Sequence, residues 1–236
     1  VSYRKAVGLY FIPSQGKYVP GKVWSLLWAA AAYQRQGADW PTAFACTIVM
    51  TGVHLISALM VAFLLGMTAL GVSSAWLFLG LFGLLAIHPS FFYGVINTAL
   101  TRVKREPVNT RLSGFELVRL LGLNSLYWCF IGVGFLCVSY SFFGHSPGFF
   151  ATASAQSLAC ATGMLAFFTP AGLGVREGAM AFFLTPVIGA GIALALSALQ
   201  RLWQLWLEVP LALLGWYFLE KRTDTPAPNQ DIIDNL

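Results

Sequence analysis

Four polar side chains recur at helical spacing in one of the most apolar parts of the chain. Ser197, Arg201, Gln204 and Glu208 are separated by four, three and four residues, which puts them on one face of a helix. An Arg or an acidic residue deep in a membrane-spanning helix costs about 2.5–3.5 kcal/mol, so this face must contact protein or water. Two interpretations are open: an Arg201–Glu208 ion pair that locks helix packing, or a stripe that lines a cavity for a charged headgroup.

Two stretches rich in glycine and proline, at 14–24 and 168–178, break the apolar sequence and carry charge. A bilayer tolerates broken backbone only where protein or a watery cavity receives the freed polar groups. Interrupted segments in corresponding places of two halves are the best sequence pointer to a transport site. We therefore expect function at these two stretches.

In the second stretch, the glycines permit backbone conformations closed to other residues, and Arg176 and Glu177 then open a short helix. In the first, Pro20 and Gly21 release helix amides beside two lysines. Free amides at a helix N-terminus together with basic side chains favour anion binding, although simple loop turns are the alternative in both places. The candidate substrate-binding residues are Lys17, Tyr18, Pro20, Gly21, Lys22, Trp24, Pro170, Gly172, Gly174, Arg176, Glu177, Arg201, Gln204 and Glu208.

The composition indicates a helical membrane protein. The chain is 58% hydrophobic and 10% charged, with a mean hydropathy of +0.72, and several apolar stretches exceed the roughly 20 residues that span a bilayer. A net charge of +5 without a dense basic run gives no support for nucleic-acid binding. The scattered cysteines and the lack of catalytic motifs predict no metal, no cofactor and no enzyme activity.

The elements that must position these residues can be read from apolar runs and breaks. We expect membrane-spanning helices at 40–65, 74–100, 115–143 and 191–219, an apolar segment at 149–168, and short helices at 22–36 and 179–188. The basic loop 102–115 is expected in the cytoplasm, together with Lys221 and Arg222. The last residues, 223–236, are expected to be a disordered cytoplasmic tail. His54, in mid-span, is more often a packed, hydrogen-bonded residue than a proton relay.

Counting crossings from the basic loop gives the two halves, 1–101 and 116–222, opposite orientations. Each half is a broken, re-entrant hairpin followed by a long helix. The expected fold class is therefore an all-α polytopic membrane protein with two re-entrant broken-helix hairpins related as an inverted repeat.

The two motifs resemble the lysylphosphatidylglycerol synthase/flippase-like integral membrane family. The resemblance rests on Gln15-Gly-Lys-Tyr-Val-Pro-Gly-Lys-Val-Trp24, on Thr169-Pro-Ala-Gly-Leu-Gly-Val-Arg-Glu-Gly178, and on Arg201-Leu-Trp203. It implies a bacterial or archaeal inner-membrane protein of about eight helices that moves lipid between leaflets. The family joins this region in some members to a soluble aminoacyltransferase domain, which we do not expect here, and usually has helices upstream of the first motif. Ala171 departs mildly from the family, in which glycine is common at that position.

Residues and resemblance together favour a flippase for an anionic or phosphate-bearing lipid, with its headgroup between the two broken motifs. Phospholipid is the expected partner, with a homo-oligomer or a separate transferase as further possible partners. The alternatives are a non-transporting subunit that binds lipid for a separate transferase, and an ion-coupled transporter of small solutes.

Overall fold

The computed structural model describes residues 3–19, 23–69, 94, 97–98, 101, 113–144, 146–166 and 169–220, and all regular structure in these ranges is helical. The expected span at 74–100, the basic loop 102–115 and the tail 223–236 lie almost wholly outside the described residues. The elements, in chain order, are α1 (Tyr3–Ser14), η1 (Gln15–Tyr18), α2 (Val23–Gln34), α3 (Trp40–Ala69), α6 (Gly114–Phe143), α7 (Phe149–Leu165), η2 (Pro170–Gly172), α8 (Val175–Ile188) and α9 (Ala190–Glu220).

Local signals set several of these helix ends. Ser113 and Glu116 form a capping box at the start of α6, where the Glu116 amide donates to Ser113 Oγ at 3.2 Å and the Ser113 amide donates to Glu116 Oε2 at 2.7 Å. This exchange satisfies two of the amides that a helix start leaves unpaired. Gly144 ends α6 in the left-handed conformation, with φ of 63°. The expected boundaries at 115–143 and 149–168 are therefore close to those observed.

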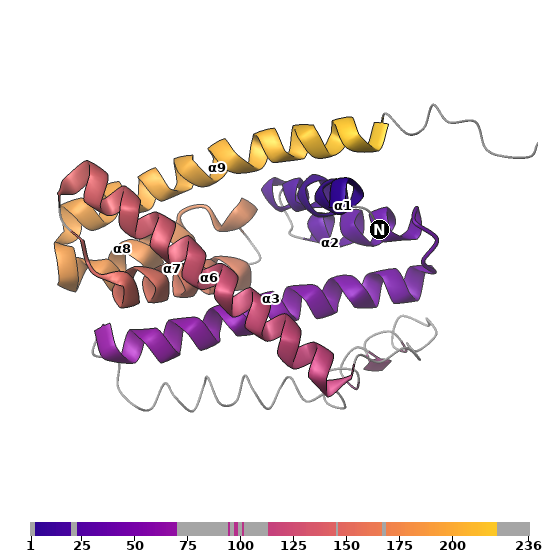
Figure 1. The fold of residues 1–236 in the computed structure, drawn as a ribbon, viewed down its shortest axis with the longest axis horizontal. Coiled ribbons are helices and arrows are strands. Elements are labelled where there is room, and N and C mark those ends of the chain that lie inside the picture. Colours follow the sequence, from indigo (N-terminus) through magenta and orange to yellow (C-terminus); the bar gives the residue numbers. More distant parts are fainter. Residues whose placement is uncertain are drawn as a thin grey trace, which may run out of the picture.

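The helices pack in a chain of neighbours that closes on itself. The long helix α3 packs against α7, α7 against α8, and α8 against α9, while α9 runs back over α1 (Figure 1). Small residues permit the close crossings: a Cβ on Gly132 would lie 2.6 Å from Ala153 Cβ, and one on Gly215 would lie 2.9 Å from Gly8 Cα. Such contacts between small residues are the usual way in which helices approach each other in a membrane.

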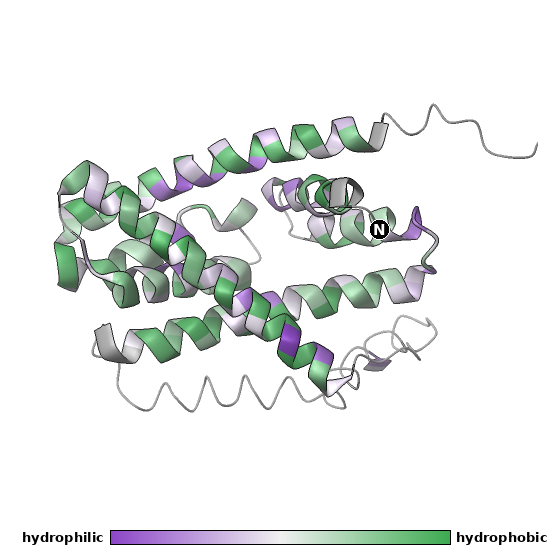
Figure 2. Ribbon diagram, in the orientation of Figure 1, coloured by the Kyte–Doolittle hydropathy of each residue, from purple (hydrophilic) through white to green (hydrophobic). Residues whose placement is uncertain are grey.

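Much of the outer surface is apolar. Phe130 on α6 is 74% exposed and Trp206 on α9 is 74% exposed, and Figure 2 shows mostly hydrophobic ribbon along α3, α6 and α9, with hydrophilic positions in the middle of α9. By length and composition, three segments qualify as membrane spans: Trp40–Gly66, Gly114–Phe143 and Pro170–Ile188. The third qualifies because the stretch from the start of η2 to the end of α8, including the turn between them, has 19 residues. This stretch is longer than the short helix expected at 179–188.

Candidate functional site

The two interrupted stretches meet in the folded chain. The short helix η1, in the first stretch, contacts η2, in the second. Glycine makes each turn tight: a Cβ on Gly16 would lie 2.7 Å from the Ser25 amide nitrogen, and one on Gly172 would lie 2.8 Å from Gly163 Cα. Segments some 150 residues apart in sequence therefore form the two sides of one polar region.

The carboxylate of Glu208 ties α9 to the first stretch. Its Oε1 lies 2.6 Å from Lys17 Nζ and accepts from Gln204 Nε2 at 2.5 Å, while its Oε2 accepts from the Tyr18 hydroxyl at 2.8 Å. Three donors, one of them charged, stabilise the ionised carboxylate in an apolar setting. Both carboxylate oxygens of Glu208 therefore have hydrogen-bond partners within the protein.

Arg201, one turn of helix from Gln204, pairs with the second stretch. Its Nε lies 3.5 Å from Glu177 Oε1, and its guanidinium carbon lies 5.5 Å from the centre of the Tyr18 ring, within cation–π range. The Arg201–Glu208 ion pair considered from the sequence is therefore not the pairing observed. The seven-residue separation spans about 10 Å along a helix axis, and each side chain finds a nearer partner on another element.

Several buried polar atoms remain without a hydrogen bond within the described residues. Arg176 and Arg201 are each only 7% exposed, yet Arg176 Nε and all three guanidinium nitrogens of Arg201 lack a hydrogen-bond acceptor. Three side-chain oxygens also lack a donor: Gln156 Oε1, Glu177 Oε1 and Gln204 Oε1. Buried polar atoms are almost always paired, so the unpaired guanidinium nitrogens suit a ligand that carries hydrogen-bond acceptors.

The charges of the described site are unbalanced. Three cations, on Lys17, Arg176 and Arg201, face two carboxylates, on Glu177 and Glu208. Lys17 and Arg201 each have an acidic partner, whereas Arg176 has none in the salt bridges of the described residues. An extra buried positive charge favours a negatively charged ligand.

Comparison with known protein families shows to which family the chain belongs. Residues 1–212 match the family model of the lysylphosphatidylglycerol synthase TM region. The chain belongs to this family. No curated protein and no solved structure matches it significantly. Membership and the apolar helices together make the chain a multi-pass helical membrane protein of the lysylphosphatidylglycerol synthase TM family.

The site residues expected from the sequence fall into three groups in this family member, besides Arg176, which is buried in the first turn of α8. One group forms a single connected network of hydrogen bonds, ion pairs and a cation–π contact: Lys17, Tyr18, Glu177, Arg201, Gln204 and Glu208. Pro170, Gly172 and Gly174 shape the turn before α8, where the Gly174 amide donates to Glu177 Oε2 at 2.7 Å. Trp24 is 46% exposed, and Pro20, Gly21 and Lys22 lie outside the described residues.

Two further residues, both on α7, were not singled out from the sequence. Gln156, on α7, is 1% exposed with an unpaired Oε1. Gly163, on the same helix, lies against both Gly172 and the side chain of Arg176. A lone glutamine in an apolar helix of small residues was the available signal for Gln156.

Proposed function

We propose that this chain transports membrane lipid, moving an anionic or phosphate-bearing lipid between leaflets rather than catalysing a reaction. The observation that carries the proposal is the pair of buried arginines beside the contact of the two interrupted stretches, in which Arg176 Nε and all three guanidinium nitrogens of Arg201 lack a hydrogen-bond acceptor. A phosphate group offers the oxygen acceptors that these guanidinium groups require, in the fork geometry that arginine matches.

The surroundings of the site support a lipid in particular. The headgroup would enter between η1 and η2, while its acyl chains stay in the bilayer against the exposed apolar faces of the helices. The match to a lysylphosphatidylglycerol synthase TM region is consistent with a phospholipid as the ligand. Lys17 would join the phosphate only if it leaves Glu208, to which it is bound in this structure.

The helix contacts support the inverted repeat that alternating access requires. In the first half, α1, η1 and α2 are followed by the long helix α3; in the second, α6 comes first, and α7, η2 and α8 are then followed by the long helix α9. The long helix of each half packs on the first arm of the other hairpin, since α3 contacts α7 and α9 contacts α1. Reciprocal packing of this kind suits two re-entrant hairpins that rock against each other around a shared site.

The proposed setting is the inner membrane of a bacterial or archaeal cell, with residues 1–222 as the membrane domain, a cytoplasmic loop at 102–115 and a cytoplasmic C-terminus. This orientation places the basic loop on the side that the positive-inside rule favours.

Reconstitution into liposomes tests the proposal. We expect fluorescent phosphatidylglycerol in the inner leaflet to become accessible to a membrane-impermeant quencher when the wild type is present. Arg176→Gln and Arg201→Gln should abolish this transfer, whereas Arg35→Gln, at an exposed arginine in the turn after α2, should leave it unchanged. Wild-type transfer by both buried-arginine variants would overturn the proposal. Tight lipid binding without transfer would favour a lipid-presenting subunit instead.

A further inference from the structure

An open hollow with a mainly apolar surface lies beside the candidate site and takes no part in the contacts described above. It has a volume of about 200 Å³ and is lined by Tyr10 on α1, His54 on α3, and Leu123, Asn124 and Tyr127 on α6. Four of its five lining side chains carry a polar group, although it lies among apolar helices. Convergent polar groups in a hollow of this kind are typical of a ligand site.

The hydrogen bonds of Asn124 fix the tautomer of His54. Asn124 Nδ2 donates to the Leu120 carbonyl at 3.0 Å, so its Oδ1 is the atom that faces His54 Nδ1, also at 3.0 Å. An amide oxygen can only accept, which places the imidazole proton on Nδ1 and leaves Nε2 as an acceptor. The expectation that His54 is a packed, hydrogen-bonded residue agrees with this arrangement.

Packing fixes the position of the His54 imidazole ring, and with it the acceptor atom Nε2. Its centre lies 4.7 Å from the ring of Trp128, which is 1% exposed and whose indole nitrogen donates to Ser57 Oγ at 3.1 Å. The hydroxyls of Tyr10 and Tyr127 make no hydrogen bond within the described part of the chain, and each can donate or accept. The hollow therefore offers one fixed acceptor and two adaptable hydroxyls.

The charges around the hollow decide which ligand chemistry it fits. Among the described residues that line it there is no Lys, Arg, Asp or Glu, so these residues provide no partner for an ionic group. His54 lies within electrostatic range of Lys17 and Arg176, and Tyr127 within range of Arg176 and Glu208. Two nearby cations outnumber the one nearby carboxylate, Glu208, and so give no advantage to an ammonium group, while the neutral donors and acceptor suit alcohol hydroxyls.

We propose that this hollow binds the uncharged, hydroxyl-bearing part of a lipid headgroup, a glycerol or sugar, while the phosphate of the same lipid is held by Arg176 and Arg201. This inference rests on the proposed function and names the substrate class of that site. Phosphate without hydroxyls would bind the arginines alone, so the hollow is what selects among anionic phospholipids. The bound hydroxyls would complete the hydrogen bonding of His54 Nε2 and of the two tyrosines.

The test compares two lipids of equal charge in nanodiscs that contain the full chain. Phosphatidylglycerol and phosphatidylethanol are both phosphodiesters, and only the first has hydroxyls on its headgroup. Native mass spectrometry of lipid retained by the wild type should show phosphatidylglycerol preferred by about threefold to tenfold, the range of one or two neutral hydrogen bonds. The Tyr10→Phe/Tyr127→Phe double variant and His54→Leu should lower that preference toward one while retaining phosphatidylethanol as well as the wild type does.

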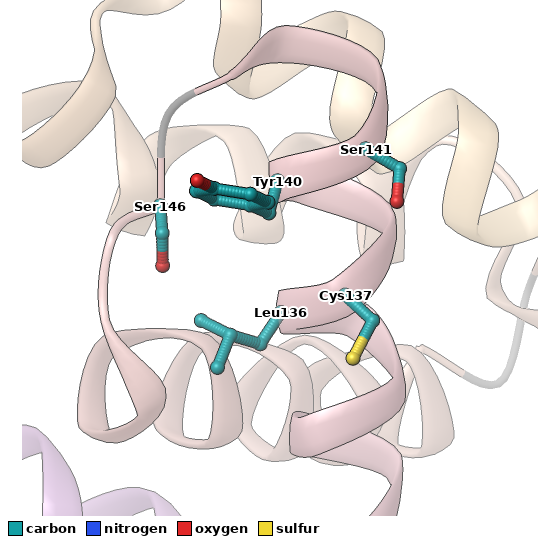
Figure 3. A pocket seen from close by; sticks show the side chains of 5 residues that line it. All are labelled: Leu136, Cys137, Tyr140, Ser141 and Ser146. Carbon is teal, nitrogen blue, oxygen red and sulfur yellow. The ribbon is translucent and has the colours of Figure 1, made fainter.

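A matched control comes from a different hollow on the same helix. Tyr140 lines a space of about 320 Å³ with Leu136, Cys137, Ser141 and Ser146, and Figure 3 shows its ring extending from α6 toward Ser146. Tyr140→Phe should leave the preference unchanged.

The outcomes separate this inference from the proposed function. Equal retention of the two lipids by the wild type, or an unchanged preference in the double-phenylalanine variant, would overturn the hydroxyl site alone. Retention of neither lipid, or retention that Arg176→Gln does not lower, would overturn the proposed function and this inference together.

Discussion

Lys17 and Glu208 are 191 residues apart in sequence, and their Nζ and Oε1 atoms lie 2.6 Å apart in the folded chain. Their side chains are 28% and 14% exposed, so the pair is largely removed from solvent. It joins η1, in the first interrupted stretch, to α9, the last long helix. The same carboxylate accepts hydrogen bonds from Tyr18 and Gln204. Glu208 is therefore the residue of α9 that binds the first interrupted stretch.

Glu208→Gln should therefore destabilise the protein by about 2–3 kcal/mol, since it leaves the Lys17 charge half-buried and unpaired. Part of the loss is offset because glutamine still hydrogen-bonds to Tyr18. Thermal or denaturant unfolding in detergent micelles measures it. Lys17→Met combined with Glu208→Gln should cost clearly less than the sum of the single changes; simple additivity would show that the two groups do not stabilise each other.

Ala171 adopts φ of 51° and ψ of 18°, a left-handed conformation that alanine rarely occupies. Replacing it with glycine should raise stability by about 0.5–1 kcal/mol despite the entropy that glycine loses on folding. The neighbouring change Gly172→Ala serves as the opposite control: φ is +72° and the new Cβ would lie 2.8 Å from Gly163 Cα. It should destabilise by about 2 kcal/mol or more. An A171G variant with a lower unfolding midpoint would contradict this reading of the turn.

The helix boundaries were accessible from the sequence because glycine and proline mark them locally. The stretches 115–143 and 191–219 were expected as membrane-spanning helices. The first is α6, Gly114–Phe143, which is long and apolar enough to cross a membrane; the second is α9, Ala190–Glu220, which is a helix but is not among the candidate spans of the described residues. The stripe on α9 was also foreseen correctly, since Ser197 and Arg201 are buried whereas Leu202 and Trp203, beside them in sequence, are exposed. Periodicity alone carries this information.

The residues that pair with the polar stripe of α9 could not be predicted from the sequence. Periodicity says which face of α9 is buried but not which element covers it, and the sequence therefore left Arg201 and Glu208 as candidates for each other. In the fold, η1 supplies Lys17 to Glu208, and α8 supplies Glu177 to Arg201. The burial of Gln156 was missed for the same reason, because nothing local in the sequence shows that this glutamine lies inside the helix packing.

Gly215 and Gly191 offer a test of the α1–α9 crossing within one helix. A Cβ on Gly215 would lie 2.9 Å from Gly8 Cα, whereas one on Gly191 meets nothing within 4 Å. Gly215→Ala should push α9 from α1 and destabilise the protein by about 1–3 kcal/mol. Gly191→Ala should be neutral or slightly stabilising, because alanine favours helix over glycine. Equal unfolding midpoints for the two variants would show that α9 does not press on α1 at this crossing.

Gly163→Ala separates the position of Arg176 from the stability of the fold. The added Cβ would lie 3.2 Å from Arg176 Cβ, close enough that the arginine must shift by a few tenths of an ångström. Alanine in mid-helix gains about 1 kcal/mol over glycine, which offsets the cost of this crowding. We therefore expect an unfolding midpoint near that of the wild type together with slower lipid transfer in liposomes and weaker retention of phosphatidylglycerol. Gly134→Ala, on α6 with nothing within 4 Å of the new Cβ, should change neither transfer nor retention. Wild-type transfer by Gly163→Ala would mean that the position of the Arg176 side chain does not limit transport, and that Arg201 alone must then account for binding of the phosphate.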